Sequence, residues 1–441
     1  MKRILSTFIC LLALLPIHAQ TEDDARIGQC LNTSDWFELK RAYEQANKET
    51  MMPMLKVFAE SMIATQFNQP ENASMAIREL MNKYGNEIGM GNIIGMGYLL
   101  ASNEARLGKY SDAAQTLNNI IQTFKQYTDS TSLAIHRQSE KQYRILAQYE
   151  GINRITSPKE DYHFPFRLDS IGFKGKRAVT MMIPAKVNQK PQDIVFDTGA
   201  GVNIVSTKAV KELGLDLHEI STGVTGVGGT QQGLFAVAQC IQLGNLTLNN
   251  VPFYVVDLSS GIDSIDVHMK HLNMILGVDF IHAMKEVQID FGKKEIVVPQ
   301  HLSTLQEGEV SNMAGGISDL FVVEGKGNDE RLLFHLDTGA GSSNLGSQYF
   351  QRYKEYITTQ CQADTLRSAG GGGILIEQAY WLPNFCLETN GTSYTFPKIM
   401  VATQGGPTDT REGNFGMDYF LQFKKVIFKK SGKQFVIYRK Y

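Results

Sequence analysis

The residues with the clearest chemical potential are two aspartates that lie in two copies of one pentapeptide. Residues 197–201 and 337–341 both read Asp-Thr-Gly-Ala-Gly, 140 residues apart, and an apolar run precedes each copy. Two carboxyl groups that meet in a fold cannot both ionise, so they share a proton and can act together as an acid and a base. Asp197 and Asp337 are therefore the candidate reactive pair, provided that the fold brings the two copies together.

The segments around the two pentapeptides are also repeated. A single Asp-Thr-Gly arises by chance in roughly one chain in ten of this length, so the surroundings decide whether the repeat has meaning. Each copy shows a strand, a turn and a strand before the pentapeptide, then a glycine cluster, then a short apolar stretch around a glycine, and last a hairpin-like segment. The matched pairs are residues 177–196 and 320–336, 226–229 and 370–373, 275–280 and 414–420, and 287–298 and 425–438. This pattern indicates a duplicated β-rich unit.

With these motifs, residues 160–441 resemble the aspartic proteases of the pepsin/retropepsin group. The Asp-Thr-Gly-Ala motifs and the Gly-Val-Gly-Gly cluster are more similar to retropepsins, which assemble two identical halves, than to pepsins. Here both halves are in one chain. The resemblance implies a bilobal all-β acid-protease fold, with lobe 1 at residues 160–300 and lobe 2 at residues 315–441.

The resemblance also implies an aspartic-type endopeptidase whose substrate is a polypeptide and which needs no cofactor. Asp197 and Asp337 would share one proton; the ionised group would activate a water, and the protonated group would hydrogen-bond to the substrate carbonyl. The supporting residues of the two loops would be threonines that bridge them and glycines that allow a tight turn. These are Thr198, Gly199, Thr338 and Gly339.

The first glycine cluster is expected to be the tip of a mobile hairpin, spanning residues 223–233, that closes over the substrate. Its candidate substrate-binding residues are Gly226, Val227, Gly228 and Gly229. Residues 370–373, four consecutive glycines, are either a second hairpin of this kind or a flexible loop.

Three departures from the pepsin pattern stand out. Ala200 and Ala340 replace the hydroxyl residue that follows Asp-Thr-Gly in pepsins, so we expect a pH optimum nearer mildly acidic or neutral than strongly acidic. His335 lies two residues before Asp337 and points to the same side by strand alternation, as a structural histidine or as a modifier of catalysis. The glycine cluster also lacks a pepsin-like tyrosine, so the role of that residue cannot be transferred.

Other chemistries fit the sequence poorly. Gly-Ser-Ser at residues 341–343 is no nucleophile elbow, and the glycine clusters lack the lysine of a phosphate-binding loop. His268 and His271 could contact a metal, but a solvated pair is the simpler interpretation because no nearby cysteine or third histidine completes a site. We therefore expect neither a metal nor a cofactor.

The front of the chain has a different pattern. Residues 23–149 show helical spacing, broken at residues 68–70 and 108–109, and Asn72 and Asp112 are expected to cap two helices forty residues apart. Residues 105–113 resemble the turn of a tetratricopeptide repeat, although the tryptophan of that repeat is missing. A helical-hairpin domain at residues 21–155 is predicted. It would serve as a surface for a protein partner or as a packing spacer.

Residues 1–20 read as an export signal, with two basic residues followed by an apolar run. A membrane anchor is the alternative, but fourteen apolar residues span only about 21 Å as a helix against a core of about 30 Å. We expect signal removal and a mature protein that is periplasmic or secreted, without a membrane segment. Cys30, Cys240, Cys361 and Cys386 would remain, too sparse for a disulfide framework, although a Cys361–Cys386 bridge stays open.

Composition sets the outer limits. The 441 residues allow two or three cores, and 43 Lys+Arg against 45 Asp+Glu leave a net charge of −2, which argues against nucleic acid as a partner. Glycine is in excess, with 40 residues beside 12 prolines. The alternative function from another class is a binding protein that uses a protease-like fold to capture peptides without cutting them.

Overall fold

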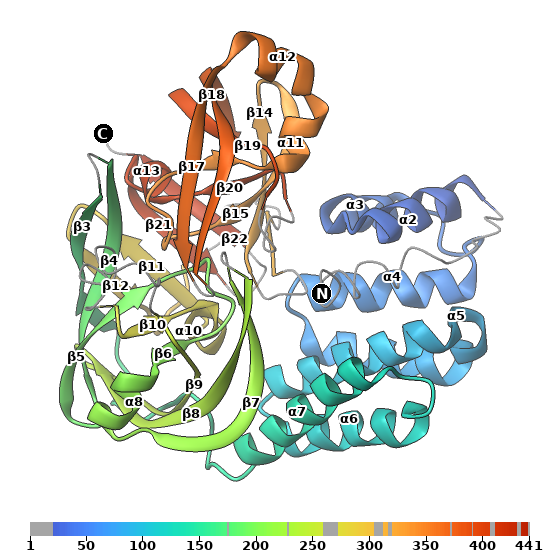
Figure 1. Cartoon of the computed structure of the whole chain (residues 1–441). Helices are drawn as coiled ribbons and strands as arrows, with labels where there is room; N and C mark the ends of the chain where they lie inside the picture. Colours follow the sequence, from blue (N-terminus) through green and yellow to red (C-terminus); the bar gives the residue numbers. More distant parts are fainter. Residues whose placement is uncertain are drawn as a thin grey trace. The chain divides into compact units, whose positions relative to one another are not determined.

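The computed structural model describes residues 21–173, 176–226, 229–258, 272–303, 312–315, 320–370, 373–389, 391–405, 411–429 and 434–439. The chain divides into two compact units, Met1–Glu150 and Gly151–Tyr441. The first unit is helical and the second is built of β-strands (Figure 1). The expected export signal at residues 1–20 and the pair His268 and His271 lie outside the described residues.

The helical unit is a series of amphipathic helices joined by short turns. Its helices are α2 (Glu22–Thr33), α3 (Trp36–Gln45), α4 (Pro53–Gln66), α5 (Pro70–Arg106), α6 (Tyr110–Phe124) and α7 (Ser130–Leu146). Both predicted breaks are confirmed, because α5 begins at Pro70 and α6 begins just after Gly108 and Lys109. The predicted caps are wrong. Asn72 and Asp112 lie inside the first turns, since Gln69 and Lys109 hold the capping positions and Pro70 starts α5.

Helix α5 is two helices that meet at Gly89. Gly89 has φ +78° and ψ 161°, which no α-helix accommodates and which glycine adopts without a steric penalty. Arg78 forms an ion pair with the buried carboxylate of Glu104. These residues would be about 39 Å apart on a straight helix, so the chain must fold back at Gly89. The two helices expected forty residues apart thus belong to two successive helical hairpins. The resemblance to a tetratricopeptide repeat stays a prediction.

Lobe 1 of the β unit is a mixed sheet with the strand order β1-β9-β6-β10-β5-β4-β8-β7, and β3 pairs with β4. Two short helices, α8 (Thr207–Leu213) and α10 (Val278–Ala283), follow β6 and β10. The strands are β1 (Arg154–Ile155), β3 (Arg167–Phe173), β4 (Lys176–Val187), β5 (Lys190–Phe196), β6 (Ile204–Ser206), β7 (Asp216–Gly226), β8 (Gly229–Leu243), β9 (Leu246–Val256) and β10 (Met274–Leu276).

Lobe 2 repeats this arrangement with the order β13-β14-β15-β20-β16-β19-β18-β17. Its elements are β13 (Met313–Ala314), β14 (Val322–Gly327), β15 (Glu330–Leu336), β16 (Asn344–Leu345), α11 (Ser347–Arg352), α12 (Lys354–Gln360), β17 (Gln362–Gly370), β18 (Gly373–Thr389), β19 (Thr392–Ala402), β20 (Gly413–Phe415) and α13 (Met417–Phe420). From β4 onward each strand of lobe 1 has a counterpart with the same neighbours, including the parallel pairs β5–β10 and β15–β20. The predicted duplication is confirmed.

The turn before each pentapeptide is tighter than the sequence indicated. Within residues 177–196, β4 and β5 continue to a two-residue loop at Asn188-Gln189, and within residues 320–336 β14 and β15 do the same at Asn328-Asp329. All four loop residues have positive φ. Two-residue hairpins need this backbone geometry to match the twist of their strands, and asparagine and aspartate tolerate it.

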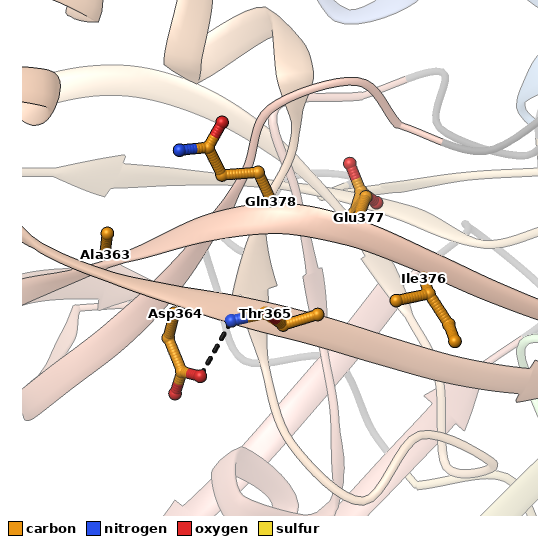
Figure 2. Close-up of a pocket in the computed structure, with 6 residues that line it drawn as sticks. All are labelled: Ala363, Asp364, Thr365, Ile376, Glu377 and Gln378. Atoms are coloured by element: carbon orange, nitrogen blue, oxygen red, sulfur yellow. Dashed lines mark hydrogen bonds between the residues drawn. The ribbon is translucent and has the colours of Figure 1, made fainter.

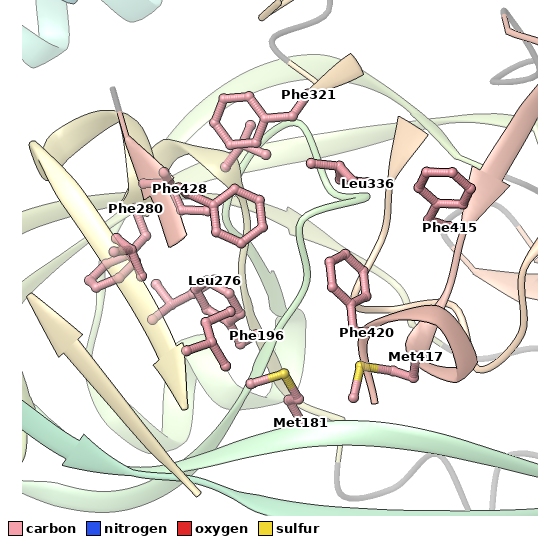
Figure 3. Close-up of a cluster of buried hydrophobic side chains, with 14 of the residues drawn as sticks. Met181, Phe196, Leu276, Phe280, Phe321, Leu336, Phe415, Met417, Phe420 and Phe428 are labelled. Atoms are coloured by element: carbon pink, nitrogen blue, oxygen red, sulfur yellow. The ribbon is translucent and has the colours of Figure 1, made fainter. Parts of the chain in front are cut away.

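A third sheet joins the lobes. Its order is β2-β12-β11-β21-β22, formed by β2 (Tyr162–Pro165), β11 (Glu286–Asp290) and β12 (Glu295–Val298) from the first half and by β21 (Phe423–Lys429) and β22 (Gln434–Arg439) from the second. The two hairpins predicted to close the halves are therefore confirmed, and β11 pairs antiparallel with β21. One apolar core runs between the lobes, and Figure 3 shows its members from both pentapeptide strands, Phe196 and Leu336, with Leu276 and Phe415.

The sequence prediction of an N-terminal helical region followed by a bilobal all-β fold is thus confirmed. The bridge left open between Cys361 and Cys386 is not formed, since both cysteines are free. Within the described part of the chain, no helix is long and apolar enough to cross a bilayer.

The sheet between the lobes gives a test of what holds them together. Phe428 on β21 is fully buried and contacts Phe321 and Phe435, at 5.8 and 5.2 Å between ring centroids. Phe428→Ala should cost about 3–5 kcal/mol and lower the melting temperature by roughly 10 °C in calorimetry. Tyr356→Ala, at a side chain 52% exposed on α12, is the control and should change stability little. Equal shifts for the two variants would contradict this role of the sheet.

Candidate active site

The two aspartates stand at the ends of equivalent strands and are held there by equivalent hydrogen bonds. The backbone N–H of Asp197 donates to the Leu276 carbonyl at 3.0 Å, and that of Asp337 donates to the Phe415 carbonyl at 2.9 Å. The loops then turn back onto the following short helix, because Val278 and Met417 donate to the carbonyls of Ala200 and Ala340. Each pentapeptide is thereby fixed to its own lobe.

The threonines bind the two loops to each other. Each hydroxyl accepts a hydrogen bond from the backbone N–H of the opposite threonine, at 3.0 Å in both directions. Thr198 Oγ1 also donates to the Leu336 carbonyl at 2.8 Å, and Thr338 Oγ1 donates to the Phe196 carbonyl at 2.9 Å. Both side chains are fully buried. Four reciprocal bonds between loops 140 residues apart thus join the two halves at the site.

The glycines allow the carboxyl groups to approach. A Cβ atom at Gly199 would overlap the Asp337 carboxyl group, and one at Gly339 would overlap that of Asp197. Each carboxylate therefore lies directly against the glycine of the opposite loop. A side chain at either position would drive the two aspartates apart.

Asp197 and Asp337 are hydrogen-bonded to each other through their side chains. Burial raises the pKa of both carboxyl groups, and the negative charge on Asp337 raises that of Asp197 further. Backbone N–H groups oppose this rise: Gly199 donates to Asp197 Oδ1 at 2.8 Å, while Gly339 and Ala340 donate to Asp337 Oδ1 at 2.9 Å each. The arrangement holds one shared proton over a wide range of pH.

Asn414 breaks the symmetry of the pair. Its side-chain amide donates to Asp337 Oδ2 at 3.0 Å and lowers the pKa of that group, whereas the equivalent position in lobe 1 is Ile275, which has no donor. Asp337 is therefore the better ionised partner and Asp197 the better proton holder. The sequence analysis missed this residue. The signal was present, since Asn414 is a polar residue where the other copy is apolar.

The other residues singled out beside the dyad take simpler roles. His335 is buried in β15, and burial, with the charge of Arg411, lowers its pKa to about 3. A histidine with that pKa is neutral above about pH 4, which agrees with a structural residue. Ala200 and Ala340 follow the glycines and offer no hydroxyl group to either carboxylate.

Both glycine clusters lie at the tips of hairpins. Gly226 pairs with Gly229 between β7 and β8, and Gly370 pairs with Gly373 between β17 and β18 (Figure 1). Gly229 has φ +126° and Gly373 has φ +119°, in a region that favours glycine. Val227, Gly228 and their counterparts at residues 371 and 372 lie outside the described residues. The first and last glycines of the four-glycine run thus close a second hairpin equivalent to the first.

An open pocket of about 480 Å³ lies on the second hairpin, and neither aspartate of the dyad is in its lining. Figure 2 shows its lining on β17 and β18, where Asp364 accepts the backbone N–H of Thr365 at 2.7 Å and the Trp381 indole N–H at 2.8 Å. The second carboxylate of the lining, Glu377, accepts the backbone N–H groups of Gln404 and Gly405 at 2.8 and 3.1 Å, so both carboxylates are already bonded within lobe 2. In the described portion of the chain, no group of three or more His, Cys, Asp or Glu side chains could hold a metal ion.

Comparison with known families supports the recognition made from the motifs. Residues 183–280 match the family described as Aspartyl protease, a stretch that contains Asp197 and the first hairpin. No curated protein matches the chain.

Among solved structures, the chain is similar to basic 7S globulin from soybean and conglutin gamma from lupine seeds. Each is 10% identical with a TM-score of 0.39, over 64% of this chain and 95% of the other. A retropepsin-like aspartic protease from Rickettsia conorii is 16% identical with a TM-score of 0.21, over 34% of this chain and 95% of its own.

The paired carboxyl groups should make stability depend on pH. A carboxyl group whose pKa is raised by folding stabilises the protein when protonated, and this contribution is lost as pH rises from about 4 through the raised value. Asp197→Asn removes the repulsion between the two groups, so the variant should melt a few degrees above the wild type at pH 8 and lose less stability between pH 5 and pH 8. Calorimetry across this range measures both effects. A variant that is less stable than the wild type at pH 8 would contradict the shared-proton arrangement.

Proposed function

We propose that the protein is an exported aspartic endopeptidase in which Asp197 and Asp337 activate a water molecule to hydrolyse peptide bonds. The observation that carries this proposal is that two carboxyl groups from identical loops meet, each lying directly against the glycine of the opposite loop. The reciprocal bonds of Thr198 and Thr338 hold these loops in register. An arrangement that forces two carboxylates together is costly, and acid–base catalysis is the chemistry that uses it.

The asymmetry of the site assigns the roles of the two groups. Asp337, which accepts from Gly339, Ala340 and Asn414, is the ionised base that takes a proton from the attacking water. Asp197 holds the shared proton and donates it to the substrate carbonyl oxygen as the carbon–oxygen bond to water forms. In the second step the carbon–nitrogen bond breaks as Asp337 gives its proton to the leaving nitrogen. Asp197 takes a proton from a hydroxyl group of the tetrahedral intermediate, which becomes the new carboxyl group, and the dyad returns to its starting state.

The hairpins and the strands around the site suit an extended polypeptide. An extended substrate gains main-chain hydrogen bonds from neighbouring strands, and the tips at Gly226–Gly229 and Gly370–Gly373 allow approach of its backbone. Movement of these tips would admit the substrate and shield it from water.

The remaining parts of the proposal come from the sequence. The signal-like residues 1–20 support a periplasmic or secreted location. The helical unit offers a surface for a protein partner, and the near-neutral charge gives no support for nucleic acid as a partner.

Peptide cleavage tests the proposal directly. The purified mature protein should cleave members of a mixed peptide library at mildly acidic to neutral pH, as measured by mass spectrometry. Asp197→Asn and Asp337→Asn should each lower kcat/KM by about 100-fold or more, because each removes one half of the acid–base pair. Cleavage that survives both substitutions would refute the assignment, and so would maximal activity at pH 2. Binding without wild-type cleavage would favour a non-catalytic peptide-binding module.

Asn414 allows the assigned roles to be tested separately. Asn414→Ile replaces the amide with the residue of the other lobe, so Asp337 loses a donor and its pKa rises. The bonds that remain to Asp337, from the backbone of Gly339 and Ala340, do not replace the lost one. The acidic limb of kcat/KM should move up by about one pH unit. Ile275→Val, at the equivalent position in lobe 1, should leave the limb in place. An unmoved limb in Asn414→Ile would contradict Asp337 as the base.

A further inference from the structure

The two lobes share their backbone arrangement but differ in the side chains that flank the dyad. Lobe 1 carries an apolar cluster that is separate from the main core. Its centre is formed by Ile204, Val224 and Val256, and four partly exposed side chains pack against it. These are Val202, Tyr254, Leu258 and Ile275.

This apolar cluster lies beside Asp197. Ile275 occupies the position at which Asn414 of lobe 2 reaches the carboxyl group of Asp337, and it pairs with Ile204 as Asn414 pairs with Asn344. Directly opposed residues of an antiparallel pair share one face of the sheet. The cluster also extends toward the first hairpin tip, because Val224 is two residues before Gly226. It therefore forms a wall from the dyad to the hairpin.

The strand register identifies the equivalent wall of lobe 2. The pairs β6–β10 and β16–β20, β6–β9 and β16–β19, and the two hairpin tips give one counterpart for each member. In the order Val202, Ile204, Val224, Tyr254, Val256, Leu258 and Ile275, the counterparts are Ser342, Asn344, Ser368, Met400, Ala402, Gln404 and Asn414. Five of these seven are polar and none is ionisable, whereas the lobe 1 wall has no polar member except the Tyr254 hydroxyl.

The polar wall is open to a ligand. Ser342 and Gln404 are exposed, and Asn344 and Ser368 are partly exposed. Asn344 lies on the face of the sheet from which Asn414 contacts Asp337, since the two residues are directly opposed. The amide and hydroxyl groups of the lobe 2 wall favour a ligand group that can hydrogen-bond to them. An aliphatic group bound there would leave them without hydrogen-bond partners.

We propose that the cleft selects peptides that carry an aliphatic side chain on one side of the cleaved bond and an uncharged hydrogen-bonding side chain, such as Asn, Gln, Ser or Thr, on the other. The proposal rests on the proposed function. The two walls are related by the same two-fold repeat as Asp197 and Asp337. They therefore flank the cleaved peptide bond of the substrate from opposite sides. The lobe 1 wall takes the aliphatic side chain and the lobe 2 wall takes the polar one.

Cleavage sites read by mass spectrometry from a randomised peptide library test the proposal. The wild type should prefer aliphatic residues on one side of the cut and uncharged polar residues on the other, by roughly tenfold or more over peptides with aliphatic residues on both sides. Asn344→Ile, which installs the lobe 1 residue in lobe 2, should reverse the preference on the polar side only. A wild-type preference for aliphatic residues on both sides would overturn the proposal, and so would an unchanged preference in Asn344→Ile.

The reciprocal exchange of wall residues is a second test. Val202→Ser installs the lobe 2 residue in lobe 1 with a small change in volume, and should weaken the aliphatic preference on its side by roughly tenfold. Ser342→Val should change the polar side. Thermal unfolding shows whether each of the three variants is folded. Cleavage preferences are then compared for those variants that melt cooperatively.

The outcomes separate this proposal from the proposed function. Cleavage with aliphatic residues on both sides overturns the selectivity and leaves the endopeptidase intact. If the wild type cuts no peptide, the endopeptidase proposal fails. Fluorescence anisotropy with labelled aliphatic–polar and aliphatic–aliphatic peptides then tests the selectivity as binding. Tenfold tighter binding of the aliphatic–polar peptide would support it, and equal binding would overturn it.

Discussion

The constraint on which the β unit depends is that two carboxyl groups must be held together in spite of their repulsion. Burial raises the pKa of both Asp197 and Asp337. The two carboxyl groups therefore stay together only if the surrounding structure prevents them from moving apart. The buried bonds of Thr198 and Thr338 provide this restraint by joining the loops crosswise. The sheet between the lobes is a second connection, because β11 of the first half pairs with β21 of the second.

The structure is a two-fold repeat whose departures from symmetry carry chemical meaning. The repeat places two equal carboxyl groups at one point, and by itself it does not fix which of the two holds the shared proton. A single amide, that of Asn414 in place of Ile275, favours the charge on Asp337. The same exchange of apolar for polar residues extends along the lobe 2 wall. One set of substitutions therefore gives the dyad its direction and the cleft its two different sides.

The helical unit shows how local backbone chemistry sets a larger arrangement. Gly89 interrupts what would be a continuous helix, and the ion pair of Arg78 with Glu104 joins the two halves that result. Helix α6 adds a bond from Thr116 to the same carboxylate at 2.8 Å. The carboxylate of Glu104 thus links successive hairpins through these two partners. Burial between the helices raises its pKa.

By itself the sequence determined the helical region, the duplicated β unit and the dyad, because these depend on residue types at fixed spacings along the chain. Asp197, Asp337 and the two glycine clusters could be found in this way because the motifs that contain them occur once in each copy. The caps at Asn72 and Asp112 were mistaken, as propensity cannot tell a capping position from the first turn that follows it. Only the tertiary structure decided the partner of Asn414, the fold at Gly89 and the faces of the two walls. These depend on strand register and on contacts between distant segments, which no local pattern records.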